Sequence, residues 1–337
     1  MKIVISSYAY APSVGGIESV TEILAREWIR LGHEVRIITR TPDAEGYGHS
    51  IPVIRNPTPI ELFRNASWCD IYFQNNISIG TLWAGLLCGK PVIITHQTWI
   101  SQGIAGMVKR LFLRMARSRV AISSAIAAKL QTDQIIPNPY RDEVFKSEGD
   151  EKREREILFV GRLVPDKGCD LLLDALCILA EQKLHPLLSI VGSGSEEPSL
   201  RKRVQELGLD SQVLFLGGRL GNDLASEYRR HRILVIPSRW EEPFGIVALE
   251  GIACGCRIVA ADTGGLPEAV GPCGKLFRSG DAGSLSAALQ LEFLRAEASG
   301  SDARMHLQRH RPEVVALEYL SLFAHLLESH PKLDPIQ

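Results

Sequence analysis

The segment 237–250 places two glutamates eight positions apart where an apolar strand gives way to a helix. Glu242 lies just before the helix and Glu250 lies about two turns into it, where carboxylates accept hydrogen bonds from sugar and ribose hydroxyls. Free backbone N–H groups at the expected helix start would suit a phosphate. They belong to Phe244, Gly245 and Ile246. A plainer interpretation is a cap and a solvated glutamate, but Glu250 sits inside the apolar run 246–252.

Two cations follow the apolar segment 157–160 on a turn that contains glycine and proline. Arg162 offers a planar fork of donors and Lys167 offers a point charge, so the two could converge on one diphosphate. There they would stabilise the negative charge that grows on a leaving group. The plainer alternative is an ordinary exposed turn.

Glycine loops and one histidine stand at other expected junctions of strand and helix. The pairs Gly15-Gly16 and Gly264-Gly265 each precede a helix, where small residues let the backbone approach a phosphate or a sugar. His96 follows the apolar segment 91–95 and could bind a hydroxyl or share in proton transfer. The alternatives are flexible turns and a loop histidine with satisfied hydrogen bonds.

The stretch 108–119 mixes cations with large apolar side chains. Such a segment could lie on an anionic membrane surface or receive an acceptor that carries a phosphate-bearing lipid. The alternative is a surface helix whose apolar side faces the core. Its cations are Lys109, Arg110, Arg114, Arg117 and Arg119.

Alternating strand and helix patterns must position these residues, and they occur in two series. The sequence predicts strands at 2–6, 34–39, 70–73, 91–95 and 120–123, and then at 157–160, 187–191, 213–216, 233–236 and 257–260. Prolines and the charged run 148–156 separate the series. The predicted fold class is α/β, with two doubly wound, Rossmann-like domains that face each other across a cleft. Ligands should bind beyond the carboxyl ends of the strands.

Composition restricts the function classes. The 337 residues carry a formal charge of −1, which gives no global basic field for nucleic acid. The seven cysteines form no paired blocks of metal ligands, and no Asp-x-Asp stands at a strand end, so we expect no metal site. We find neither a leading apolar signal nor a run long enough to span a membrane, and we expect a cytoplasmic protein, with contact to the inner membrane face as an option.

In order and spacing, these segments resemble the retaining GT-B glycosyltransferases of family 4 over nearly the whole chain. Glu242 and Glu250 match the paired glutamates of that family, and Arg162 with Lys167 matches its diphosphate clamp. Gly15-Gly16, His96 and Gly264-Gly265 match its glycine loop, its histidine near the donor sugar and its donor loop.

The resemblance implies a sugar transfer from a nucleotide-diphosphate donor to a glycan or a lipid-linked acceptor. It implies no cofactor and no metal, with Glu242 on the donor sugar, Glu250 on the ribose, and the cations and amides on the diphosphate. It also divides the chain into an acceptor-side domain (1–145), a nucleotide-sugar domain (146–310) and a helix that returns to the first domain (311–330).

Three alternatives stay open at this point. A sugar-nucleotide epimerase would have a similar two-domain fold and use no acceptor. A nicotinamide-dependent oxidoreductase would need a dinucleotide fingerprint, which is missing here. A non-catalytic sugar-nucleotide binder would show no turnover.

Overall fold

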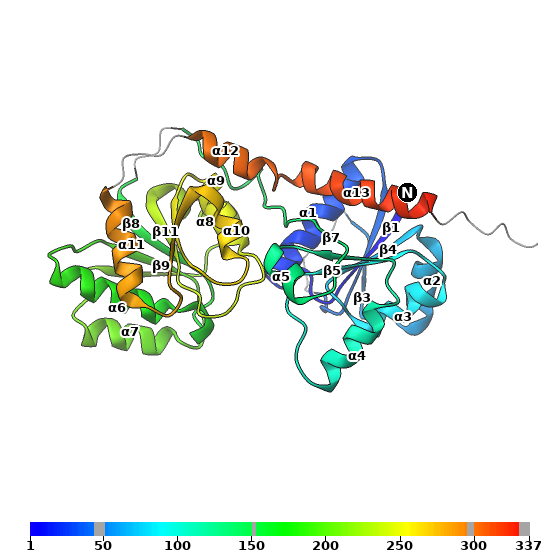
Figure 1. Cartoon of the computed structure of the whole chain (residues 1–337), viewed down its shortest axis with the longest axis horizontal. Helices are drawn as coiled ribbons and strands as arrows, with labels where there is room; N and C mark the ends of the chain where they lie inside the picture. The colour runs from blue at the N-terminus through cyan, green and yellow to red at the C-terminus, as the bar shows by residue number, and fades with distance from the viewer. Residues whose placement is uncertain (44–50, 150–152, 295–299, 330–337) are drawn as a thin grey trace, which may run out of the picture. The chain divides into compact units, whose positions relative to one another are not determined.

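The chain folds into two compact units, which the computed structural model describes except at residues 44–50, 150–152, 295–299 and 330–337 (Figure 1). The first unit combines Met1–Tyr140 with His310–Gln337, and the second is Arg141–Arg309. The boundaries predicted from the sequence were 145 and 310. Part of the charged run 148–156 lies outside the described residues.

A seven-stranded parallel sheet with the order β3-β2-β1-β4-β5-β6-β7 forms the first unit. Its strands are β1 (Lys2–Ser7), β2 (Glu34–Thr39), β3 (Val53–Arg55), β4 (Ile71–Asn75), β5 (Val92–His96), β6 (Ser118–Ala121) and β7 (Gln134–Ile135). Ile3, Val4 and Ile5 of β1 are all fully buried. A continuous apolar run is typical of a parallel strand that is covered on both faces.

Helices cover this sheet: α1 (Gly16–Arg30), α2 (Pro59–Trp68), α3 (Ile79–Leu87), α4 (Ile104–Leu113) and α5 (Ser124–Lys129). On α1, Val20, Leu24 and Trp28 are buried, as their helical spacing predicts. Thr58 and Glu61 form a capping box that fixes the start of α2.

The last helix, α13 (Pro312–Glu328), packs on α1 in the first unit, although the second unit precedes it in the chain (Figure 1). The Trp28 indole N–H donates to the Ala316 carbonyl over 3.2 Å. Trp28 also meets Phe323 edge-on, with 5.3 Å between ring centroids. The Tyr319 and Thr95 hydroxyls are 3.0 Å apart. These contacts confirm the predicted return of the C-terminal helix.

A six-stranded parallel sheet forms the second unit, in the order β10-β9-β8-β11-β12-β13. Its strands are β8 (Arg155–Val160), β9 (Leu188–Val191), β10 (Val213–Gly217), β11 (His231–Ile236), β12 (Arg257–Ala261) and β13 (Gly274–Phe277). The helical elements are η1 (Pro165–Lys167), α6 (Cys169–Glu181), α7 (Glu197–Glu206), α8 (Gly221–Arg230), α9 (Ile246–Ala253), α10 (Leu266–Val270), η2 (Gly271–Cys273), α11 (Ala282–Leu294) and α12 (Gly300–Gln308).

Both sheets are doubly wound, which confirms the predicted α/β class with two Rossmann-like domains. In the second sheet the order changes direction between β8 and β11, which are neighbours. Loops at such a switch point diverge to opposite faces and leave room for a ligand at the carboxyl edge. In the first sheet the same change falls between β1 and β4.

The packing of α13 predicts that Phe323→Ala destabilises the first unit by about 3 kcal/mol or more, because it empties a fully buried aromatic site. Leu317→Ala on the same helix is the matched control, since Leu317 is 48% exposed. Calorimetric unfolding should show one transition moving to lower temperature in the Phe323 variant only. Equal shifts in both variants would contradict the described docking of α13.

Candidate functional site

The loops that follow β8 and β11 are held together by their main chains. The N–H groups of Arg239 and Trp240 donate to the Asp166 carbonyl over 2.9 and 3.3 Å. Gly168 has a φ of +66°, and a Cβ atom there would lie well inside 3.0 Å of the Pro237 carbonyl oxygen. Only glycine therefore fits this approach. The switch point is thus built from two loops in direct backbone contact.

Lys167 and Glu242 meet across these two loops. The Lys167 Nζ atom forms an ion pair with Glu242 Oε1, and the Ser238 hydroxyl donates to the same oxygen over 2.9 Å. The Glu242 side chain is only 12% exposed and that of Lys167 is 23% exposed. The structure therefore brings one predicted cation and one predicted carboxylate into a single, largely buried cluster, together with Ser238, which was not predicted as a site residue.

Arg162 lies on the same loop as Lys167 but is exposed and forms no ion pair with a described acidic residue. The loop after β9 supports this segment, because the Leu163 N–H donates to the Ser193 carbonyl over 2.9 Å. The planar guanidinium group of Arg162 thus lies on a loop held by a backbone hydrogen bond, and it can bind an anion.

The helix that carries Glu250 begins later than expected. Gly245 is the N-cap of α9, with a φ of +122°, and Ile246 is the first helical residue. The predicted start near Phe244 is therefore wrong, because the left-handed backbone at Gly245 ends the loop before the helix can begin. Phe244 is 2% exposed and packs in the core. The first amides of α9 still lack acceptors within the helix and can face an anion.

Glu250 lies deep among its neighbours, although part of the residue is accessible. The Tyr228 hydroxyl donates to Glu250 Oε2 over 3.1 Å. Burial raises the pKa of the Glu250 carboxyl to about 7, against smaller lowering effects of that hydrogen bond and of the Arg141 charge. Tyr228 itself packs edge-on against Phe145, with 5.8 Å between centroids. A carboxyl group whose pKa lies near 7 is present in both protonation states at pH 7. It accepts hydrogen bonds when charged and can also donate one when protonated.

The loop after β12 packs directly on the Glu242 backbone. The Gly265 N–H donates to the Glu242 carbonyl over 2.7 Å. A Cβ atom at Gly264 would clash with Glu242 backbone atoms, and one at Gly265 would clash with the Pro243 carbonyl. The structure therefore brings the predicted glycine loop 263–268 and the glutamate segment together.

In the first unit, Gly15 caps α1 and Gly16 is its first residue, and both are exposed. His96 ends β5 and is fully buried, and neither of its ring nitrogens has a hydrogen-bond partner among the described residues. Burial lowers the pKa of His96 to about 4, and the nearby Arg119 charge adds to this effect. The ring is neutral at pH 7, and its unsatisfied nitrogens can bind a polar ligand group.

The part of the chain that the structure describes holds no group of three or more His, Cys, Asp or Glu side chains arranged to bind a metal ion. None of its helices has the length and apolar character needed to cross a bilayer. The arrangement at the second sheet can instead bind a polyanion with hydroxyl groups through cations, helix amides and two carboxyl groups.

Family models match both units. Residues 14–141 match the model described as Glycosyltransferase Family 4, and residues 140–299 match the model described as Glycosyl transferases group 1. A D-inositol 3-phosphate glycosyltransferase of Gordonia bronchialis is 31% identical over 217 residues, which are 60% of this chain and 47% of that protein. The aligned part therefore spans less than half the length of this curated relative.

Solved structures of similar fold cover almost the whole chain. The Anabaena protein HepE, in complex with UDP and glucose, superimposes with a TM-score of 0.80 at 21% identity, over 96% of this chain and 99% of that one. Sucrose-phosphate synthase of Thermosynechococcus elongatus gives 0.78 at 23% identity, over 98% and 100%. These superpositions establish the fold alone, which is the GT-B fold with two Rossmann-like domains.

The raised pKa of Glu250 predicts a pH dependence of stability. Between the unfolded value of 4.5 and the folded value of about 7, the folded protein binds more protons than the unfolded one. The contribution of Glu250 to the free energy of unfolding is therefore lost as pH rises through this window. Glu250→Gln should remove that part of the decline, as measured by urea unfolding at pH 5, 6, 7 and 8.

The exposed residue Glu206 provides a control, because Glu206→Gln should keep the wild-type slope of unfolding free energy against pH. Identical slopes in wild type and Glu250→Gln would show that the carboxyl titrates normally.

Proposed function

The chain belongs to the glycosyltransferases of group 1 and family 4, and on that premise we propose that it transfers a hexose from a nucleotide-diphosphate donor to a glycan or a lipid-linked acceptor. The observation that carries the proposal is the cluster of Lys167, Glu242 and Ser238 beside the first amides of α9. It offers a positive charge for a phosphate and a carboxylate for sugar hydroxyls in one place.

The diphosphate is bound by Arg162, Lys167 and the amides that follow Gly245. Arginine stays charged at any working pH, lysine adds a mobile point charge, and the helix start adds N–H donors. Together they stabilise the charge that develops on the leaving diphosphate. We propose that these groups take the place of a divalent ion, so the reaction needs no metal and no cofactor.

The hydroxyl groups of the donor are bound by the two glutamates. Glu250 accepts hydrogen bonds from the ribose, and Glu242 binds the sugar and places its anomeric carbon, next to Gly264 and Gly265. Without a donor, Glu242 neutralises Lys167. Donor binding exchanges this pair for a phosphate on Lys167 and a sugar hydroxyl on Glu242. From the first unit we propose that His96 binds a hydroxyl group of the sugar nucleotide. We also propose that the backbone N–H groups at Gly15-Gly16 donate hydrogen bonds to one of its phosphates.

The reaction breaks the bond between the anomeric carbon and the diphosphate oxygen and forms a bond to an acceptor hydroxyl oxygen. In the retaining course the acceptor attacks from the face that the diphosphate leaves. The acceptor proton passes to an oxygen of the leaving phosphate, and a nucleoside diphosphate and a glycoside are released. We place this activity in polysaccharide biosynthesis in the cytoplasm, at the inner membrane face when the acceptor is lipid-linked.

Metal independence predicts that the initial rate with the correct donor persists in excess EDTA. The double variant Arg162→Ala/Lys167→Ala should lower the rate about 1000-fold or more, because the leaving group loses both of its cations. Lys202→Ala is the matched control, since Lys202 lies on α7 and pairs only with Glu206 among the described residues. Full loss of activity in EDTA, restored by magnesium or manganese, would show that a metal handles the charge.

The position of Glu242 predicts that Glu242→Gln lowers turnover by about 100-fold while nucleotide affinity stays near that of the wild type. The substitution removes the negative charge that orients the sugar. Lys167 then lacks its counterion and can still bind phosphate. Kinetics should be compared with calorimetric titration of the nucleoside diphosphate, with exposed Glu241→Gln as the neighbouring control. Near-normal turnover in Glu242→Gln would remove this residue from the reaction.

A further inference from the structure

Helix α4 carries an apolar stripe that faces solvent. Ile104, Met107, Leu111 and Met115 follow one another at spacings of three and four residues, which places them on one side of the helix and its end. Their exposed fractions are 79%, 64%, 61% and 57%. The opposite side of the helix packs inward through Leu113, which is buried. The helix is thus apolar on both sides. A surface helix with one apolar side facing the core was the plainer alternative, and the structure adds a second apolar side that faces solvent.

Cations lie beside this stripe and have no acidic neighbours in the sequence. Residues 71–132 contain seven lysines and arginines and no aspartate or glutamate. Arg110 and Arg114 are exposed and form no ion pair within the described residues. Arg119, by contrast, is bound by Asp133 at 2.7 Å. Within the basic stretch 108–119, Arg110 on α4 and Arg114 at its end are exposed beside the apolar stripe and open to an anion.

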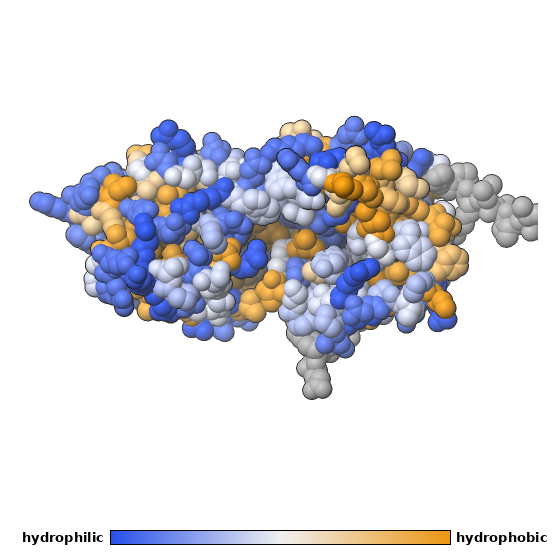
Figure 2. Space-filling view, turned by 90° about the horizontal axis from the view of Figure 1, so that it is seen from below, coloured by the Kyte–Doolittle hydropathy of each residue, from blue (hydrophilic) through white to orange (hydrophobic). Residues whose placement is uncertain are grey.

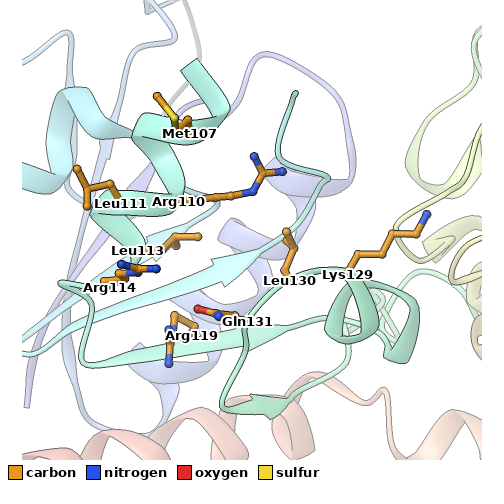
Figure 3. Close-up of a pocket in the computed structure, with 9 residues that line it drawn as sticks. All are labelled: Met107, Arg110, Leu111, Leu113, Arg114, Arg119, Lys129, Leu130 and Gln131. Carbon is orange, nitrogen blue, oxygen red and sulfur yellow. The ribbon is translucent and has the colours of Figure 1, made fainter. Parts of the chain in front are cut away.

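A pocket of about 380 Å³ opens between α4, β6 and the segment after α5. Figure 3 shows Met107 and Leu111 on α4 and Arg110 extending from the helix toward the side of Leu130. Its walls combine four cations with apolar side chains and hold no carboxylate: Met107, Arg110, Leu111, Leu113, Arg114, Arg119, Lys129, Leu130 and Gln131. This composition suits a phosphate that is attached to an apolar group.

The face as a whole combines these features. Figure 2 views the first unit from the side on which α4 protrudes and shows apolar and hydrophilic side chains next to each other there. A free phosphate would use the arginines but leave the stripe of Ile104, Met107 and Leu111 in water. A second copy of the chain would bring the same unpaired cations against each other, at an electrostatic cost. A bilayer with anionic lipids satisfies both the stripe and the cations.

We propose that α4 is a monotopic membrane anchor, which lies in the plane of an anionic bilayer with its apolar stripe among the acyl chains and Arg110 and Arg114 on lipid phosphates. The pocket beside it receives one lipid headgroup. The attraction between each cation and such a surface is weak and screened by salt, so the contact is reversible and sensitive to salt. The anchor depends neither on the identity of the donor nor on that of the acceptor.

Vesicle flotation of the full chain tests this anchor. Vesicles of phosphatidylglycerol and phosphatidylcholine should recover the wild type at low salt, and pure phosphatidylcholine should recover ~10-fold less. Arg110→Gln/Arg114→Gln should lower recovery ~10-fold, and Met107→Ser/Leu111→Ser should lower it as well. Lys202→Gln/Lys275→Gln removes the same charge from the second unit and should float like the wild type.

Thermal unfolding and sedimentation complete the experiment. Each variant should keep the wild-type unfolding temperature within about 3 °C, since the exchanged side chains are exposed, and the wild type should sediment as the same species as Met107→Ser/Leu111→Ser. Equal recovery by neutral vesicles, or normal flotation of Arg110→Gln/Arg114→Gln, would overturn the proposal. A wild-type dimer that Met107→Ser/Leu111→Ser dissociates would also overturn it. So would thermal stabilisation by inorganic phosphate that depends on Arg110 and Arg114, if the protein binds no vesicles.

Discussion

The main chains of three loops touch at the carboxyl edge of the second sheet, and no side chain fits between them. Gly168 lies against the Pro237 carbonyl, and Gly264 lies against the backbone of Glu242. A methyl group at either contact would force the loops apart, at a cost of about 1–3 kcal/mol. The close approach therefore fixes the relative positions of Lys167 and Glu242 through rigid backbone rather than through long side chains. The roles proposed for Lys167 and Glu242 depend on this spacing.

Electrostatics at this edge joins folding to ligand binding. The side chains of Lys167 and Glu242 are both largely buried, and each compensates the charge of the other. Removal of one partner leaves a charge without compensation, whereas a phosphate and a sugar hydroxyl can replace both partners together. The raised pKa of Glu250 has the same origin, since burial opposes its charge and Tyr228 offsets only part of that effect. A site of this kind is arranged for a ligand that is both anionic and rich in hydroxyl groups.

The fold and the main members of the site follow from the sequence because they leave strong local signals. Buried parallel strands are continuous apolar runs, and glycines mark the loops that approach one another. The short strands β3, β7 and β13 were not predicted, because strands of two to four residues, most of them partly exposed, carry little periodicity.

Tyr228 was not predicted as a partner of Glu250 because the contact joins α8 to α9 through packing, not spacing. Periodicity also does not say which of two apolar sides of α4 faces inward.

Thermal unfolding in the presence of UDP-, GDP- and ADP-sugars tests the central claim, that the second unit binds a nucleotide-diphosphate sugar, most directly. A ligand that binds the folded state at 100 times its Kd stabilises it by about 2.7 kcal/mol, so the shift should grow with concentration. We predict that the sugars of one nucleotide raise the unfolding temperature of the second unit. The nucleoside diphosphate of that series, without its sugar, should raise it too. No shift with any sugar nucleotide or diphosphate, at millimolar concentration, would contradict the account.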